Sequence, residues 1–124
     1  MIRIGVDMAS VSQIAHSLSV STGFAASVFT LDERETAGRL PAYRAHEYLA
    51  GRFAVKEAVL KALHLGIEDQ TKMREIEVFS ELDGSPSLRL AGSVAGSALA
   101  IGLSDWQVSI SHNDGLVVAF VLLS

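Results

Sequence analysis

The sequence predicts an α+β fold in which an antiparallel sheet packs with one long central helix, as a single domain over residues 1–124. Two observations carry this prediction. Residues 42–63 keep the apolar spacing of an α-helix over about six turns. Short alternating or apolar segments near both ends of the chain are typical of strands. A hydrophobic content of 49% in 124 residues is enough for one buried core.

The first predicted strand covers residues 2–7, where apolar side chains occupy alternate positions from Ile2 to Val6. A helical pattern follows and continues to Leu18. Asp7 therefore stands at a strand-to-helix junction, and two interpretations of it remain open. It can cap the helix, or it can hold a hard cation together with a second acid from elsewhere in the chain.

The middle and end of the chain predict further helices, a hairpin and a final strand pair. Thr30 and Glu33 have the spacing of a capping box. Gly66 is the expected end of the long helix. The last strand is almost wholly apolar, so we expect both of its faces to be covered, if necessary by another subunit. The expected elements are a helix at 23–29, strands at 75–79 and 87–90 around a DGSP turn, a helix at 93–103, and strands at 106–111 and 116–123.

The long helix carries four charged side chains within GRFAVKEAVLKA, residues 51–62. Large apolar side chains form one stripe and alanines form another, which indicates a mostly buried helix whose charges need partners. Glu57 and Lys61 share one flank, Arg52 lies on roughly the opposite side, and Lys56 falls inside the apolar stripe. This set suggests a bound anion together with a metal. A purely structural alternative remains, in which Glu57 and Lys61 form an ordinary helix pair and the other two bases reach the surface along their stems.

A third informative segment is VSISHNDG, residues 108–115. We expect Val108 and Ile110 to point to one side of a strand, and Ser111 and His112 to the other. A hydroxyl and an imidazolium at a strand end suit a phosphate group. The alternative is a loop histidine with a structural role only.

Taken in order, IGVD (residues 4–7), GRFAVKEAVLKA (51–62) and SISH (109–112) resemble the holo-acyl-carrier-protein synthases, the small bacterial class of 4′-phosphopantetheinyl transferases. The resemblance runs along the whole chain. It implies Mg²⁺-dependent transfer of the phosphopantetheine arm of coenzyme A to a serine of an apo acyl carrier protein, with release of adenosine 3′,5′-bisphosphate. Such a reaction activates carriers for fatty-acid or polyketide synthesis.

The resemblance also implies roles for single residues. Asp7 and Glu57 match the metal ligands, and Glu57 and Lys61 the catalytic groups, with Lys61 also reaching the pyrophosphate of coenzyme A. The proton acceptor is either Glu57 or a metal-bound water that it orients. Arg52 and His112, with Ser111 as a helper, match the site of the 3′-phosphate.

The resemblance further implies that small members of the family form trimers, with the clefts between neighbouring subunits. We therefore expect Asp7, Glu57 and Lys61 of one chain to face Arg52 and His112 of the next chain in a homotrimer.

The chain departs from the family pattern at two places. Many relatives carry Arg six residues after the metal Asp, on the helix that meets the carrier protein, whereas this chain has Gln13. Recognition of the acceptor is then less electrostatic, or it involves a carrier domain of a larger synthase. The common GTG segment is replaced by residues 64–66, in which Gly66 alone matches, so Gly66 is the one coenzyme A contact expected from that loop.

Composition narrows the remaining function classes. The chain has no cysteine, which excludes a disulfide framework and thiol chemistry, and its net charge of −4 argues against nucleic-acid binding. It has neither a GxxxxGK[ST] nor a GxGxxG segment, and no signal or membrane segment, so we expect a cytoplasmic protein. Two other functions would each explain some of the three motif segments. One is a non-catalytic trimeric coenzyme A binding module, and the other is a magnesium-dependent nucleotide hydrolase.

Overall fold

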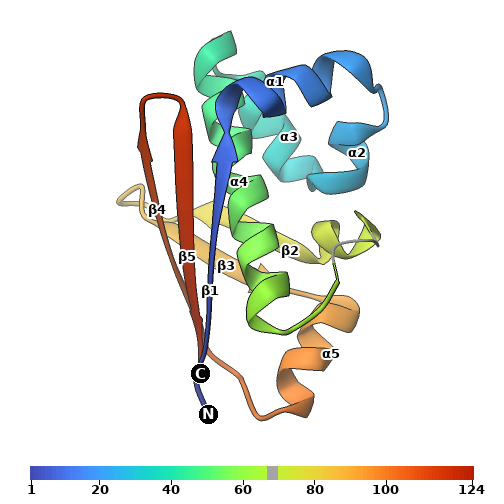
Figure 1. Ribbon diagram of the computed structural model, residues 1–124, viewed down its shortest axis with the longest axis vertical. Helices are drawn as coiled ribbons and strands as arrows, with labels where there is room; N and C mark the ends of the chain where they lie inside the picture. The colour runs from blue at the N-terminus through green and yellow to red at the C-terminus, as the bar shows by residue number, and fades with distance from the viewer. Residues whose placement is uncertain (67–69) are drawn as a thin grey trace.

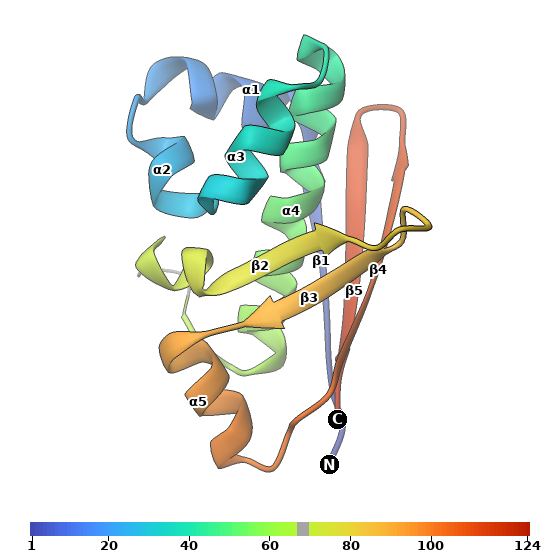
Figure 2. The same ribbon diagram turned by 180° about the vertical axis from the view of Figure 1, so that it is seen from behind.

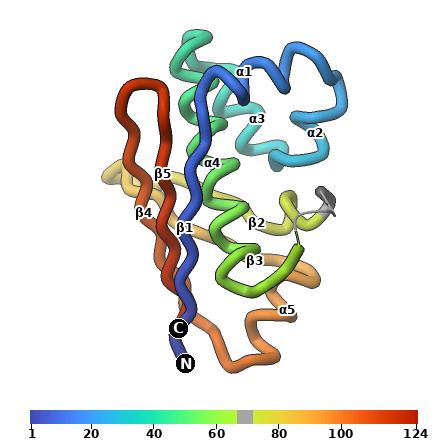
Figure 3. Tube along the Cα trace, viewed as in Figure 1, coloured from blue at the N-terminus to red at the C-terminus, as the bar shows by residue number. Residues whose placement is uncertain are grey.

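The long helix α4 (Ala42–Ala62) lies between two antiparallel sheets (Figures 1 and 2). The larger sheet has three strands in the order β1 (Arg3–Ser10), β5 (Leu116–Leu123), β4 (Trp106–Asn113), and it packs along the length of α4. The two chain ends lie side by side at one end of this sheet (Figure 3). The predicted α+β class with one long central helix is therefore confirmed.

A computed structural model describes residues 1–66 and 70–124 of the chain. Three short helices cluster at one end of α4, and the hairpin of the smaller sheet crosses α4 on the side away from the larger sheet (Figure 2). No helix among the described residues is long and apolar enough to cross a membrane. The remaining elements are α1 (Val11–Val20), α2 (Phe24–Val28), α3 (Leu31–Gly38), the 3-10 helix η1 (Gln70–Glu75), β2 (Ile76–Ser80), β3 (Pro86–Leu90) and α5 (Gly92–Ala100).

Strand β1 alternates as predicted, but its apolar residues lie on the exposed face. Ile4, Val6 and Met8 are all more than half exposed, while Gly5 and Asp7 point toward α4. Gly5 explains this choice, because a Cβ at Gly5 would overlap the carbonyl oxygen of Ala58 on α4. The helix can approach the strand this closely only where no side chain intervenes.

Strand β5 shows the same division. Val117, Ala119, Val121 and Leu123 are buried against the helix side, whereas Leu116, Val118 and Phe120 are exposed. The expectation that both faces of this strand are covered is therefore not met within a single chain. Together with β1, the strand leaves a continuous apolar face open, since Val6 pairs with Phe120 and Met8 with Val118.

The start of α1 settles one open question about Asp7. Strand β1 continues to Ser10, three residues beyond the predicted end, and the hydroxyl of Ser10 accepts a hydrogen bond of 3.3 Å from the backbone N–H of Gln13. Ser10 is thus the helix cap. Asp7 lies inside the strand, so it caps nothing.

The start of α3 agrees with the prediction from sequence, and the end of α4 does not. The capping box of Thr30 and Glu33 is present, with reciprocal hydrogen bonds of 2.9 and 3.2 Å. The end of α4 was predicted wrongly: it is His64, at φ 58°, that takes the left-handed conformation, rather than Gly66. The backbone N–H of Leu65 donates to Leu60 and that of His64 to Lys61, the pattern of a Schellman motif.

Candidate functional site

Asp7, Glu57 and Lys61 meet where β1 crosses α4. Alternation along β1 turns Asp7 toward the helix, and the i,i+4 spacing places Glu57 and Lys61 on one flank of α4. The ammonium of Lys61 forms an ion pair with Oδ1 of Asp7. Asp7 is nearly buried and Lys61 is largely exposed, so the cluster reaches from the protein interior to solvent.

The two carboxyl groups of the cluster act on each other. Burial of Glu57, and then the adjacent Asp7, raise the pKa of the Glu57 carboxyl to about 8, while Lys61 works in the opposite direction. The hydrogen bond to Asp7 raises the pKa of the Lys61 ammonium. A carboxyl group whose ionisation is opposed by burial and by a neighbouring acid, as that of Glu57 is, would be stabilised in its charged form by a cation.

The geometry around Asp7 fits a hard cation. Among the residues that the structure describes, Oδ2 of Asp7 is buried and has no hydrogen-bond partner. The described residues contain no group of three or more His, Cys, Asp or Glu side chains able to hold a metal. Mg²⁺ does not require one, because it accepts one or two carboxylates and completes its shell with phosphate oxygens and waters. Asp7 and Glu57 are suitable ligands on this ground.

A cavity of about 320 Å³ opens beside this cluster. Glu57 and Phe53 of α4 form one wall, and α1 forms another with Gln13 and Ser17. A second molecule can reach Glu57 through this cavity. The other lining residues are Met8, Ala9, Ser10, Ile14 and Phe24.

Arg52 and His112 meet in a different cavity of about 300 Å³, between α4 and strands β4 and β5. Arg52 is 9% exposed; its guanidinium lies 3.9 Å from the centre of the Tyr48 ring and donates a hydrogen bond of 3.3 Å to the hydroxyl of Ser80. Its buried Nε atom has no partner among the described residues. Nδ1 of His112 lies 3.3 Å from the Glu47 carboxylate. A guanidinium and an imidazole at the wall of one cavity can bind a phosphate.

The expected orientation was right for Val108, Ile110 and Ser111 of β4 but wrong for His112. His112 faces the same side as Ile110 because residues two apart in a strand share a face. Its register partner is the buried Val117, whereas Ser111 pairs with the exposed Val118. Ser111 thus points to the open face of the sheet, away from the Arg52 cavity. Its role as a helper remains a prediction.

The two groups of residues do not meet within one chain. Arg52 and Glu57 are five residues apart on α4, which places them about 140° apart around the helix axis. Glu57 and Arg52 accordingly line different cavities of the chain, and a site shared between subunits stays a prediction.

Lys56 has no part in either group. It is completely buried and forms an ion pair of 2.8 Å with Glu33 of α3. Neither alternative considered from sequence applies, since Lys56 neither reaches the surface nor offers its charge to a ligand.

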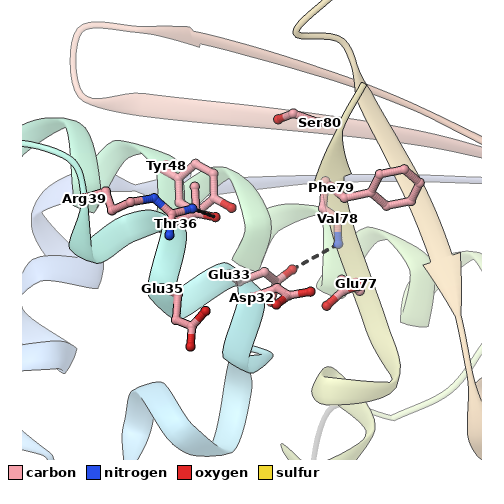
Figure 4. A pocket seen from close by; sticks show the side chains of 10 residues that line it. All are labelled: Asp32, Glu33, Glu35, Thr36, Arg39, Tyr48, Glu77, Val78, Phe79 and Ser80. Carbon is pink, nitrogen blue, oxygen red and sulfur yellow. Dashed lines mark hydrogen bonds between the residues drawn. The ribbon is translucent and has the colours of Figure 1, made fainter. Parts of the chain in front are cut away.

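Sequence reasoning missed several residues around Arg52 and one further cavity. Tyr48 lies four residues before Arg52, and this spacing would have indicated a stacking partner. No sequence pattern near Ser80 or Glu47 indicates that these residues contact Arg52 and His112. The further cavity, of about 320 Å³, lies between α3 and β2 (Figure 4). Four of its ten lining residues are acidic and Arg39 is its one base, so it does not suit a polyanion such as coenzyme A. Its acidic lining residues are Asp32, Glu33, Glu35 and Glu77.

The last predicted contact, Gly66, is exposed and immediately precedes residues 67–69, which lie outside the described part of the chain. Its contact with coenzyme A stays a prediction.

Comparisons with known proteins all indicate the same family. A family model described as the 4′-phosphopantetheinyl transferase superfamily matches residues 3–121. The holo-[acyl-carrier-protein] synthase of Frankia casuarinae is 37% identical over 98% of this chain and 96% of its own length. The enzyme of the same name from Clavibacter michiganensis is 41% identical over 98% of this chain and 95% of its own.

Comparison with solved structures indicates the same family as the sequence relatives. The structure of a Chronobacterium ammoniagenes ACPS–CoA complex superimposes with a TM-score of 0.84 at 32% identity, covering 100% of this chain and 97% of that one. The match of fold extends over both groups of site residues, and the predicted enzyme class is confirmed. The chain belongs to the holo-[acyl-carrier-protein] synthase family of 4′-phosphopantetheinyl transferases.

Proposed function

We propose that this protein transfers the 4′-phosphopantetheine arm of coenzyme A to a serine hydroxyl of an apo acyl carrier protein, in a Mg²⁺-dependent reaction. The observation that carries the proposal is the cluster of Asp7, Glu57 and Lys61 beside an open cavity, with one oxygen of Asp7 buried and unpartnered. The family supplies the substrate class, because relatives are named for this activity and one of the solved structures is a complex with CoA. The compartment we propose is the cytoplasm.

The chemistry is a phosphoryl transfer at a pyrophosphate. The serine oxygen bonds to the phosphorus that carries the pantetheine, and the bond from that phosphorus to the bridging oxygen breaks. Adenosine 3′,5′-bisphosphate leaves with the electron pair. Magnesium held by Asp7 and Glu57 would neutralise charge on the pyrophosphate.

Residues of the chain perform the remaining work. Lys61 carries a flexible ammonium at the solvent edge of the cluster, where it can neutralise a phosphate oxygen. The Glu57 carboxylate accepts the proton of the serine hydroxyl, directly or through one water.

We further propose that the active enzyme is a homotrimer whose sites lie between subunits. The proposal is supported by the apolar face that β1 and β5 leave open, because contiguous exposed apolar faces mark protein–protein contacts. It is also supported by the separation of the Arg52 cavity from the Asp7 cluster on α4. A second copy on the open face would supply the missing half of each site, with Arg52 and His112 binding the 3′-phosphate.

Intact-mass spectrometry of an apo acyl carrier protein, incubated with this protein, coenzyme A and magnesium, tests the transfer. We expect a mass gain of ~340 Da, which is the phosphopantetheine arm. The gain should vanish with EDTA and in a Glu57→Gln variant. A folded protein that binds coenzyme A but modifies none of several fatty-acid and polyketide carriers would contradict the proposal.

A further inference from the structure

Apart from Glu57 and the adjacent ion pair of Asp7 and Lys61, the lining of the Glu57 cavity carries no formal charge. Between Asp7 and Asp32 the chain contains no Asp, Glu, Lys or Arg, and His16 is the one titratable side chain. This stretch forms α1 and α2, which line the cavity. The exposed side chains of α1 are instead hydroxyl, amide, imidazole and apolar groups: Ser12, Gln13, His16, Ser19 and Val20.

A macromolecular acceptor has to cover this surface. Its serine must enter the cavity to approach Glu57, and the cavity is lined on the α1 side by Ser10, Gln13 and Ser17. A folded protein that delivers a short side chain into the cavity therefore packs against the first turns of α1. On the other flank of α1 an acid is present, since Asp114 lines a neighbouring cavity together with Ser12.

The energetics of such a contact favour an uncharged partner. A charged side chain that is buried against this face loses its hydration without gaining a counter-ion, which costs free energy. Hydroxyl and amide groups can be satisfied by hydrogen bonds across an interface, and exposed Val20, at 66%, adds apolar area. An acidic surface gains no ion pair from α1, which has no Lys or Arg, and Asp114 opposes it.

We propose that the hydroxyl-rich face of α1 docks a carrier whose surface beside the acceptor serine is poor in charge. The contact is made by hydrogen bonds and apolar packing instead of ion pairs. This inference rests on the proposed function and adds to it the chemistry of the protein substrate.

The test uses two versions of one carrier: an acidic carrier, and the same carrier with the acids beside its serine changed to Asn or Gln. The Michaelis constant for each is measured at about 50 and about 400 mM NaCl, with coenzyme A and magnesium saturating at each salt concentration because coenzyme A binding is itself salt-dependent. We expect the neutralised carrier to have the lower Michaelis constant, and its value to change less than about twofold with salt.

A charge placed at the cavity should create the dependence that the wild-type protein lacks. Gln13→Arg is expected to lower the Michaelis constant for the acidic carrier at low salt, and to make that constant rise steeply with salt. Ala100→Arg, which adds the same charge on exposed α5 at the far end of α4, controls for the change in net charge and should leave both carriers unaffected.

The outcomes separate this inference from the proposed function. Transfer to the acidic carrier with a Michaelis constant that rises about tenfold with salt in the wild-type protein would overturn the inference and leave the transferase intact. Preference of the wild-type protein for the acidic carrier would also overturn it. Absence of transfer to every carrier at every salt concentration would instead refute the proposed function.

Discussion

The ammonium of Lys56 lies 2.8 Å from the carboxylate of Glu33, with both side chains withdrawn from solvent. Lys56 also donates to the carbonyl oxygens of Met73 and Ile76, and Glu33 accepts a hydrogen bond of 3.0 Å from the N–H of Val78. Burial lowers the pKa of the Lys56 ammonium, and Glu33 offsets part of this effect. The pair thus ties α3, α4 and β2 together on the side of α4 away from Asp7.

Replacement of Lys56 by Met should destabilise the protein by about 3–5 kcal/mol, because it leaves a buried carboxylate without its partner. Urea unfolding followed by circular dichroism measures the loss. A second change, Glu33→Gln, should restore part of the stability by removing the isolated charge. The matched control is Arg44→Met, which removes an exposed base of α4, where a change within about 1 kcal/mol is expected. A similarly small effect of Lys56→Met would show that the pair is dispensable.

The raised pKa of Glu57 predicts a pH dependence of stability in the metal-free protein. Folding shifts the Glu57 pKa upward from 4.5 to about 8, so between these values the folded state binds more protons than the unfolded state. Stability therefore falls as the pH rises from 5 to 8. Glu57→Gln removes this contribution, so the variant should gain stability relative to the wild type over that interval. Urea midpoints in EDTA at both ends of the interval measure this, and parallel curves for the two proteins would be the contrary result.

Gly5→Ala tests whether close approach of β1 to α4 positions the Asp7 cluster. The new methyl group would overlap the Ala58 carbonyl oxygen and lie 3.2 Å from Cβ of Ala62. Overpacking of this kind costs about 1–3 kcal/mol and pushes the strand away from the helix. We expect lower stability together with a loss of transfer rate measured in folded protein. Gly96→Ala on α5, where nothing lies within 4 Å, is the control and should be neutral or stabilising. Full activity of Gly5→Ala would argue against this role of the strand.

Arg52→Lys should reduce the preference for coenzyme A over dephospho-coenzyme A. Lysine keeps the charge but loses the planar fork that stacks on Tyr48 and donates to Ser80. A charged hydrogen bond of this type contributes about 1.5–3 kcal/mol, so the Michaelis constant for coenzyme A should rise about tenfold or more. Dephospho-coenzyme A lacks the 3′-phosphate and should be affected little. Equal losses for both substrates would place the 3′-phosphate elsewhere.

Mixed oligomers test the shared site. Asp7→Ala and His112→Ala proteins should each be inactive, because each lacks one half of the site. After subunit exchange, mixed trimers should regain part of the activity, since some interfaces pair an intact Asp7 cluster with an intact His112. The rate of carrier modification is followed after the two proteins are mixed, with each variant alone as the control. Absence of recovery in verified mixed trimers would count against sites between subunits.

The sequence by itself determined the features that depend on local chemistry. The helical period of α4, the Thr30–Glu33 capping box and the alternation of β1 are all set by neighbours a few residues away. The family was also recognisable, because IGVD, the charged α4 segment and SISH keep their order and residue types. Glu57 and Lys61 share a flank of α4 by helix geometry alone.

Tertiary structure decided which partner each side chain has. Alternation shows that β1 has two faces, but the fit of Gly5 against Ala58 chooses the face that α4 covers, and this turns Asp7 toward Lys61. Lys56 and Glu57 are adjacent in sequence, yet Lys56 forms a buried ion pair with Glu33, whereas Glu57 lines a cavity. His112 faces Glu47 because β4 is registered against β5. These outcomes depend on contacts between residues far apart in the chain, whose geometry no local pattern encodes.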